Sequence, residues 1–299
     1  MTAQQQACED APIMASRIPA HSSMKFLAIV FVLLSSVAAA NGGFFDDNPA
    51  THHAPPDPAL TDLDLDVLLL CGQWGSRINA REFESMMLKD EHRETLDRIF
   101  QAVGGRIFSR ADDRDEFVRQ LRRAWFQENG FKHVFCGEPG VGKDLGGFHY
   151  AARYWQAQDE GWATWRPLKK DHNSRPTAKC RHFYYRQKIR HPIYNISVRF
   201  KNPEDPRTNV KCITGYHYEM HAERLLIAGI MAFKQANKRV GKNAKEACLH
   251  ETRVPGVDSH YSTLVISNRA IRTFYAMPDR RPYCRKNKKD PRACLCSKL

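Results

Sequence analysis

The chain has 299 residues, of which 42% are hydrophobic and 26% are charged. This length and apolar content suffice for a packed core and exclude a wholly disordered chain. Lysine and arginine outnumber aspartate and glutamate by 46 to 33, which gives a net charge of +13. Such a charge favours a polyanionic partner, namely RNA, DNA, an anionic glycan or an acidic membrane, although many basic secreted proteins bind no particular polyanion.

The first 40 residues contain a targeting signal that does not start at residue 1. Met24 and Lys25 open an apolar run that ends in three alanines, Ala38 to Ala40. A basic start, a short apolar core and an A-x-A ending are typical of a secretory signal peptide. We therefore expect residues 1–23 to be an extension upstream of the true start, residues 24–40 to be a signal peptide, and the protein to be secreted. The run is too short for a comfortable membrane span, so an uncleaved type II anchor is the less favoured alternative.

The elements predicted in chain order are helices first and strands later. Residues 41–59 are rich in Pro, Asp and Asn and predict a linker, after which residues 60–70 enter the folded region. Apolar periodicity predicts helices over residues 80–105, 111–130, 147–161 and 217–241, a short strand at 133–136, a strand at 195–200, and a hairpin over 261–278 that turns at Ser267-Asn268. This order predicts an α+β fold, with a helical N-terminal part followed by antiparallel sheets with packed helices. The folded domain is expected over residues 60–280, and a basic, cysteine-containing tail over 281–299.

Cysteine usage agrees with secretion. Eight cysteines follow Met24, and an even number in an oxidising compartment predicts up to four disulfides whose connectivity the sequence leaves open. No group of cysteines and histidines has the spacing of a metal site, so no metal ligands are predicted. The eight are Cys71, Cys136, Cys180, Cys212, Cys248, Cys284, Cys294 and Cys296.

Residues 137–144, GEPGVGKD, come within one residue of the phosphate-binding motif G-x-x-x-x-G-K-[ST]. The position that should hold a magnesium-binding hydroxyl is Asp144, a carboxylate that phosphate would repel. Gly146 and Gly147 follow, and a glycine pair is a poor start for a phosphate-binding helix. The segment therefore predicts no nucleotide cofactor.

Two histidines, His133 and His149, flank this loop. If the loop folds back, the two imidazoles can share one substrate group. Metal-free RNA cleavage needs such a pair, because one imidazole removes the 2′-hydroxyl proton and the other protonates the departing 5′-oxygen. A Lys or Arg must also stabilise the charge of the transition state. The alternative is that one or both histidines are structural.

The motif H-V-F-x-G-E at residues 133–138, a glycine-rich loop and then G-G-F-H at 146–149 resembles the EndoU endoribonuclease family. The resemblance extends over residues 60–280 and implies that His149 is the general base and His133 the general acid. Lys211, just before the strongest predicted helix, is the best match to the family's catalytic lysine, with Lys179 and Lys201 as competitors.

The final hairpin carries the family's Thr-x-Tyr motif followed by a proline. The resemblance implies that Tyr275 contacts the base or sugar and that Thr273 helps to shape the site. The family places a serine for uracil recognition shortly after its lysine; the nearest hydroxyl here is Thr214, and uridine preference depends on that departure.

Together these features predict a secreted endoribonuclease that cleaves single-stranded RNA at uridylates and leaves 2′,3′-cyclic phosphate ends. The resemblance implies that no cofactor is required, with manganese as an activator. The alternative is an EndoU-like secreted binder of RNA or anionic glycan that has lost catalysis. The oligomeric state is left open.

Overall fold

The computed structural model describes residues 43–47, 54–139, 145–165, 180, 188–202, 205–238, 240–241 and 243–299. The expected upstream extension and signal peptide lie outside the described residues, as do positions 140–144 of the glycine-rich loop and the competing Lys179. In the part of the chain that is described, no helix is long and apolar enough to cross a bilayer.

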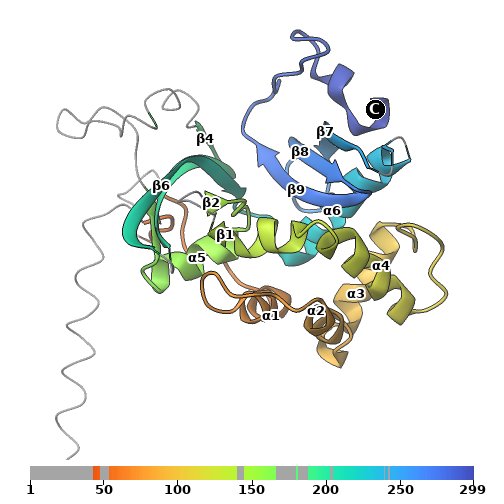
Figure 1. Ribbon diagram of the computed structural model, residues 1–299, viewed down its shortest axis with the longest axis horizontal. Coiled ribbons are helices and arrows are strands. Elements are labelled where there is room, and N and C mark those ends of the chain that lie inside the picture. The colour runs from red at the N-terminus through yellow and green to blue at the C-terminus, as the bar shows by residue number, and fades with distance from the viewer. Residues whose placement is uncertain are drawn as a thin grey trace, which may run out of the picture. The chain divides into compact units, whose positions relative to one another are not determined.

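The helical N-terminal part is observed as predicted in type, but one predicted helix is wrong in extent (Figure 1). Instead of one helix over 80–105, the chain forms α2 and α3, separated by a turn and the short helix η2. The turn is held to α1 by tertiary bonds, since Asp66 accepts from Lys89 Nζ at 2.6 Å and from His92 Nε2 at 2.7 Å. The elements are α1 (Asp62–Cys71), α2 (Ala80–Met87), η2 (Asp90–His92), α3 (Arg93–Ala102) and α4 (Arg114–Phe126).

The predicted strand at residues 133–136 is also wrong. Lys132–Cys136 form one turn of π-helix, η3, in which Val134, Phe135 and Cys136 are all buried. A run of four residues is too short for periodicity to distinguish a strand from a buried helical turn. The result matters for the site, because His133 lies on a helical turn instead of a strand.

The second half contains two antiparallel sheets. In the first, β5 (Ile193–Asn202) pairs with β3 (Ala163–Trp165), β4 (Lys188–Arg190) and β6 (Asp205–His217). In the second, β7 (Lys245–Thr252), β8 (His260–Ser267) and β9 (Ala270–Met277) lie in sequence order. Asn268 and Arg269 both have positive φ, which makes the tight turn of the predicted hairpin. Helices α5 (Ala151–Asp159) and α6 (Ala222–Asn237) complete the α+β fold, which the sequence predicted. Strands β3, β4, β6 and β7 were not predicted, and β6 ends at His217, so the helix predicted over 217–241 begins later, at Ala222.

Two apolar cores hold these layers together. The larger packs α1 to α4, η3 and α6 against the β7–β9 sheet, and the smaller, rich in aromatic rings, lies between α5 and the first sheet. Phe44 and Phe45 are buried in the smaller core, and Gln158 Oε1 accepts from the backbone N–H of both. The expectation of a linker over 41–59 is therefore wrong for residues 43–47, because two adjacent phenylalanines gain more from burial than from exposure.

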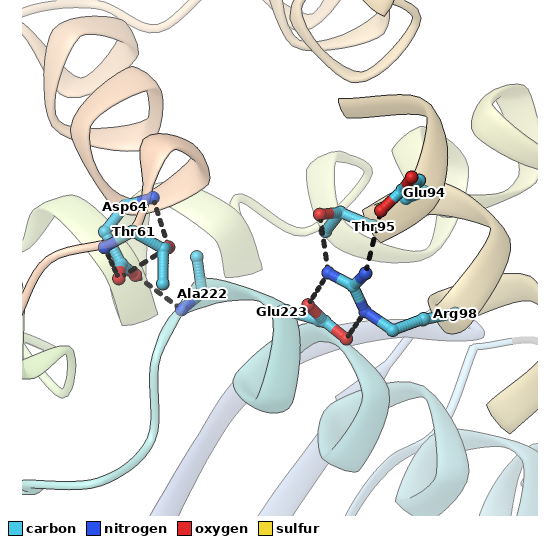
Figure 2. Close-up of polar contacts among 7 residues, drawn as sticks. All are labelled: Thr61, Asp64, Glu94, Thr95, Arg98, Ala222 and Glu223. Atoms are coloured by element: carbon cyan, nitrogen blue, oxygen red, sulfur yellow. Dashed lines mark hydrogen bonds and ion pairs between the residues drawn. The ribbon is translucent and has the colours of Figure 1, made fainter. Parts of the chain in front are cut away.

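A buried carboxylate joins the first helix to the longest one. Asp64 accepts from Thr61 in the capping box of α1 and, at 2.7 Å, from the N–H of Ala222 at the start of α6. Figure 2 shows this junction and, one residue further along α6, the ion pair of Glu223 with Arg98 of α3 at 2.8 Å. Tyr150 and His221 also bond Asp64, at 2.5 and 2.8 Å. Burial raises the pKa of Asp64, but the bonds from His221, Tyr150 and the two backbone groups outweigh it and lower the pKa below its usual value.

All eight cysteines after Met24 are paired, which confirms the disulfides expected from their number. The tail is joined to the sheet by Cys248–Cys296 and closed on itself by Cys284–Cys294, while the other pairs are Cys71–Cys136 and Cys180–Cys212. Four disulfides are consistent with an extracellular protein, because such bonds persist in oxidising compartments.

Candidate active site

The two predicted histidines are brought together by main-chain bonds between their segments. The N–H of Phe148 donates to the carbonyl of His133 at 2.8 Å, and the N–H of His149 donates to the carbonyl of Val134 at 2.9 Å. The ring centroids of His133 and His149 are 5.9 Å apart. Between the two segments, β1 (Glu138–Pro139) pairs with β2 (Leu145–Gly146), so the flanks of the loop form a short hairpin.

This close approach requires the glycine at position 147. Gly147 has a φ of +62°, and a Cβ there would lie 1.7 Å from the carbonyl oxygen of His133. The next residue, Phe148, also has a positive φ, 73°, which is costly for an aromatic side chain. The backbone is therefore held in an unfavourable conformation directly before His149.

The flanks of the loop do not have the architecture of a nucleotide site. A phosphate-binding loop follows a buried strand and leads into a helix. Here the turn η3 precedes the loop, and β2 and the turn at Gly147 and Phe148 follow it before α5 begins at Ala151. The described flanks agree with the prediction that the segment is a connector, while residues 140–144 themselves lie outside the described part.

His149 has one nitrogen bound and one available. Its Nδ1 lies 3.0 Å from the carbonyl oxygen of Gly215, and because a carbonyl only accepts, Nδ1 carries the hydrogen and Nε2 holds the lone pair. Tyr275 stacks on the imidazole with ring centroids 4.9 Å apart and an angle of 24°. Burial of the ring lowers the pKa of His149 to about 3, and the positive charges of His133 and Lys211 act in the same direction. His149 is therefore a neutral imidazole at physiological pH.

His133 has the opposite environment. Its Nδ1 lies 2.8 Å from Oε2 of Glu138, and that carboxylate also accepts from both terminal nitrogens of Arg272, at 2.9 and 3.2 Å. Burial raises the pKa of Glu138, but the bonds from His133 and Arg272 outweigh it and lower that pKa to about 2. A charged carboxylate thus binds Nδ1 of His133 and orients its ring.

Strand β6 supports His149 with two adjacent residues. Gly215 supplies the carbonyl bound by the ring, and the hydroxyl of Thr214 lies 2.8 and 2.9 Å from the carbonyl oxygens of Gly147 and Phe148. Thr214 is buried, so its hydroxyl faces the protein. Lys211 pairs with Val198 of β5, with an irregularity in the strand register between it and Thr214, and its charge contributes to the lowered pKa of His149. The competing Lys201 is exposed on β5.

The two residues predicted from the final hairpin both lie on β9. Tyr275 is part of the site through its contact with His149. Thr273 is almost fully buried, and no group of the described chain bonds its hydroxyl. The structure thus brings Tyr275, Lys211 and the two histidines together, and Thr214 is buried against the backbone that precedes His149.

One group of three potential metal ligands is found among the described residues, and it consists of Asp66, Glu91 and His92. The ammonium group of Lys89 lies 2.6 Å from Asp66 and 3.1 Å from Glu91, so a cation already occupies these carboxylates. The group belongs to α1 and η2, which contribute no residue to the histidine pair.

Glu138 and Arg272 were not predicted as site residues. Glu138 was visible as the last residue of the H-V-F-x-G-E motif, five positions after His133, although nothing there indicated a bond between them. Arg272 was one of 46 basic residues, and only folding brings it to a carboxylate 134 positions away.

Comparisons with known proteins identify the family of the chain. A search of curated proteins gives no significant match. The chain resembles a solved structure described as "The structure of XendoU: a splicing independent snoRNA processing endoribonuclease", with 15% identity, a TM-score of 0.41, and coverage of 66% of this chain and 68% of that one. The family model described as "Bacterial EndoU nuclease" matches residues 127–280, which is more than half of the chain and includes both histidines, Lys211 and Tyr275. The chain belongs to the EndoU nuclease family.

Proposed function

We propose that the protein is a secreted endoribonuclease that cleaves single-stranded RNA at uridylates through its 2′-hydroxyl. Nε2 of His149 takes the proton of the 2′-hydroxyl, and the 2′-oxygen attacks the adjacent phosphorus. The bond from phosphorus to the 5′-oxygen breaks, and His133 gives its proton to that oxygen. The products are a 2′,3′-cyclic phosphate and a 5′-hydroxyl.

The observation that carries this proposal is the difference between the two imidazoles. Pairs of titratable groups whose environments favour opposite protonation states are typical of acid–base sites. His149 is stacked, largely removed from solvent and neutral, with a free lone pair on Nε2. His133 is oriented by the charged Glu138 carboxylate at its Nδ1, and we assign it the role of general acid.

Three further residues have proposed roles. Lys211 supplies the cation that stabilises the charge developing on the phosphate. Tyr275, with one face on His149, presents its other side to the base or sugar of the substrate. Thr214 holds the backbone that carries His149, through the bonds of its hydroxyl to the carbonyls of Gly147 and Phe148. Thr273 helps to shape the site, and its buried hydroxyl has no partner among the described groups. Because the Thr214 hydroxyl faces Gly147 and Phe148, we do not assign it a contact with uracil. The proposed uridine preference rests on the family resemblance and on contact of the base with Tyr275.

The test is cleavage of a fluorogenic oligonucleotide with a single uridine, with the products identified by mass. We expect a 2′,3′-cyclic phosphate at the uridine, slower cleavage when cytidine replaces it, and no cleavage when the sugar is 2′-deoxyribose. The histidine chemistry needs no metal, so substantial activity should persist in chelator, and added manganese should raise it. Absence of cleavage with and without manganese would leave the non-catalytic binder of RNA or anionic glycan as the better explanation.

Glu138→Gln is expected to lower kcat/KM by about 100-fold, within the range for loss of acid–base catalysis. The amide keeps the shape of the side chain but removes the charge that Arg272 and His133 share, and it places an N–H₂ group against donors. The matched control is Glu128→Gln, because Glu128 Oε1 accepts only from Asn268 Nδ2 on the surface at 2.8 Å. Equal activity of both variants would contradict the role given to Glu138.

A further inference from the structure

A groove of about 540 Å³ lies beside the histidine pair. One wall is the end of β9, from Tyr275 to Asp279, and the other is formed by Asn195 of β5, Ile213 of β6 and Lys188 of β4. Tyr283 of the C-terminal tail also lines the groove. We call this the tail groove; its volume is in the range of small-molecule sites and is large enough for a nucleotide.

The tail groove is continuous with the candidate active site. Tyr275 stacks on His149 and also lines the groove. Ile213, which also lines the groove, follows Lys211 by two residues along β6. An RNA strand with its scissile phosphate at the two histidines therefore passes into the tail groove with the nucleotide next to the cleaved one.

Tyr283 is an exposed aromatic side chain on a fixed backbone. It is 65% exposed, whereas its neighbours Pro282 and Cys284 are buried. Cys284 is bonded to Cys294, and Cys248–Cys296 joins the same tail to the β7–β9 sheet. Single exposed apolar residues are common on protein surfaces, but the backbone of this ring is fixed by its buried neighbours and the ring lines a groove.

The charge of the C-terminal tail suits a polyanion. Residues 279–299 contain eight Lys and Arg residues and two Asp residues. Asp279, the acidic residue in the groove wall, is neutralised by an ion pair with Lys188. A basic surface with an exposed aromatic ring is the usual arrangement for binding single-stranded RNA, with phosphates on the cations and a base stacked on the ring.

We propose that the tail groove is a second nucleotide subsite, in which the base flanking the cleaved nucleotide stacks on Tyr283. The inference rests on the proposed function and extends it to how the substrate is selected. The family model ends at residue 280, so Tyr283 lies outside the matched region. Through this subsite, the disulfide-bound tail makes an oligonucleotide a better substrate than a single nucleotide.

The test compares two substrates of different length. One is uridine 3′-phosphate esterified to a fluorogenic aryl alcohol, which contains one nucleotide only; the other is a hexanucleotide with a single internal uridine. For Tyr283→Ala we expect kcat/KM on the hexanucleotide to fall about tenfold, as for loss of one stacked base, with no change on the aryl ester. Tyr283→Trp should retain the hexanucleotide activity. The matched control is Leu69→Ala, which removes another exposed apolar side chain, on α1, and should change neither value.

Other outcomes overturn the inference. Equal kcat/KM of Tyr283→Ala and the unmodified protein on the hexanucleotide would show that no base stacks there. An equal loss on both substrates would assign Tyr283 a structural role only. If the unmodified protein cleaves neither substrate, the proposed function is wrong, but the subsite can still be tested by binding. The measurement is fluorescence anisotropy with a hexanucleotide that contains 2′-deoxyuridine. Tyr283→Ala should bind this hexanucleotide about tenfold more weakly than the unmodified protein does.

Discussion

His149→Ala is expected to reduce kcat/KM for a uridine-containing RNA by about 10³-fold or more, because removal of a general base typically costs 10² to 10⁴ in rate. The variant loses the Nε2 lone pair that takes the 2′-hydroxyl proton, and Lys211 and His133 cannot replace it as a base while they carry positive charge. The measurement is initial rates on the fluorogenic oligonucleotide at several enzyme concentrations. Folding of the variant is checked by its thermal unfolding curve.

The matched control is His191→Ala, which removes an exposed histidine whose Nδ1 lies 3.1 Å from the hydroxyl of Tyr194. This variant should retain activity within about twofold, since surface substitutions change little. If His149→Ala keeps more than a tenth of the activity while His133→Ala does not, the assignment of the base to His149 is wrong.

The pH dependence of the unmodified protein tests the same residue independently. A general base works when it is unprotonated, that is, above its pKa, and the pKa of His149 is lowered to about 3. We therefore expect kcat/KM to show no decline attributable to this group as the pH falls from 6.5 to about 4, whereas an ordinary histidine base would lose activity through pH 6.5. Circular dichroism at each pH excludes acid unfolding as the cause of any loss. A decline centred near pH 6.5 in protein that is still folded would contradict the environment described for His149.

Asp64→Ala is expected to lower the free energy of unfolding by about 3–5 kcal/mol, the usual cost of removing one partner from a buried charged network. The substitution removes the acceptor shared by Thr61, His221, Tyr150 and the N–H of Ala222, and the last two of these donors are buried. For a domain of this size the change corresponds to a fall in the melting temperature of roughly 10 °C. The measurement is thermal and urea unfolding at pH 7.

Asp62→Ala is the matched control, because Asp62 lies in the same first turn of α1 but is exposed. Its loss should cost less than about 1 kcal/mol, the contribution of a surface carboxylate at a helix start. A second variant, Asp64→Asn, tests whether the charge of Asp64 stabilises the protein, because the stability difference from the unmodified protein should depend on pH. The lowered pKa of Asp64 means that its stabilisation is fully present above the unfolded value of about 3.9 and is lost as the pH falls further. The difference between Asp64→Asn and the unmodified protein should therefore shrink below pH 4; a difference that stays constant would contradict the role of the charge.

The helices and the final hairpin could be predicted because their patterns are local. The apolar stripe of Phe117, Leu121 and Trp125 repeats at helical spacing, and the polar pair at the Ser267-Asn268 turn separates two alternating runs. The errors occurred where long-range contacts outweighed local preference. The helix over 80–105 breaks where Lys89 and His92 bind Asp66, and the expected linker is packed because Phe44 and Phe45 enter an aromatic core.

The residues of the candidate site could likewise be predicted only where their sequence pattern is local. His133 and His149 were identified because their motif is short and contiguous, and Lys211 and Tyr275 because each precedes or ends a recognisable element. Glu138 and Arg272 could not be found in this way, since their bond joins residues 134 positions apart. Thr214 was identified from the sequence as the hydroxyl for uracil recognition, but its hydroxyl bonds the carbonyls of Gly147 and Phe148, an orientation that the sequence does not reveal.

The sequence by itself determined the two imidazoles, the even set of cysteines and the α+β order of elements, because residue identity and short-range spacing are sufficient for each. Only the tertiary structure decided that the imidazoles differ. Their distinct surroundings come from groups contributed by remote elements. The Glu138 carboxylate, held by Arg272 of β9, contacts His133, whereas a carbonyl of β6 and the Tyr275 ring contact His149. The same folding places Tyr283 in the lining of the tail groove, because two disulfides fix a segment whose composition alone predicts only a basic tail.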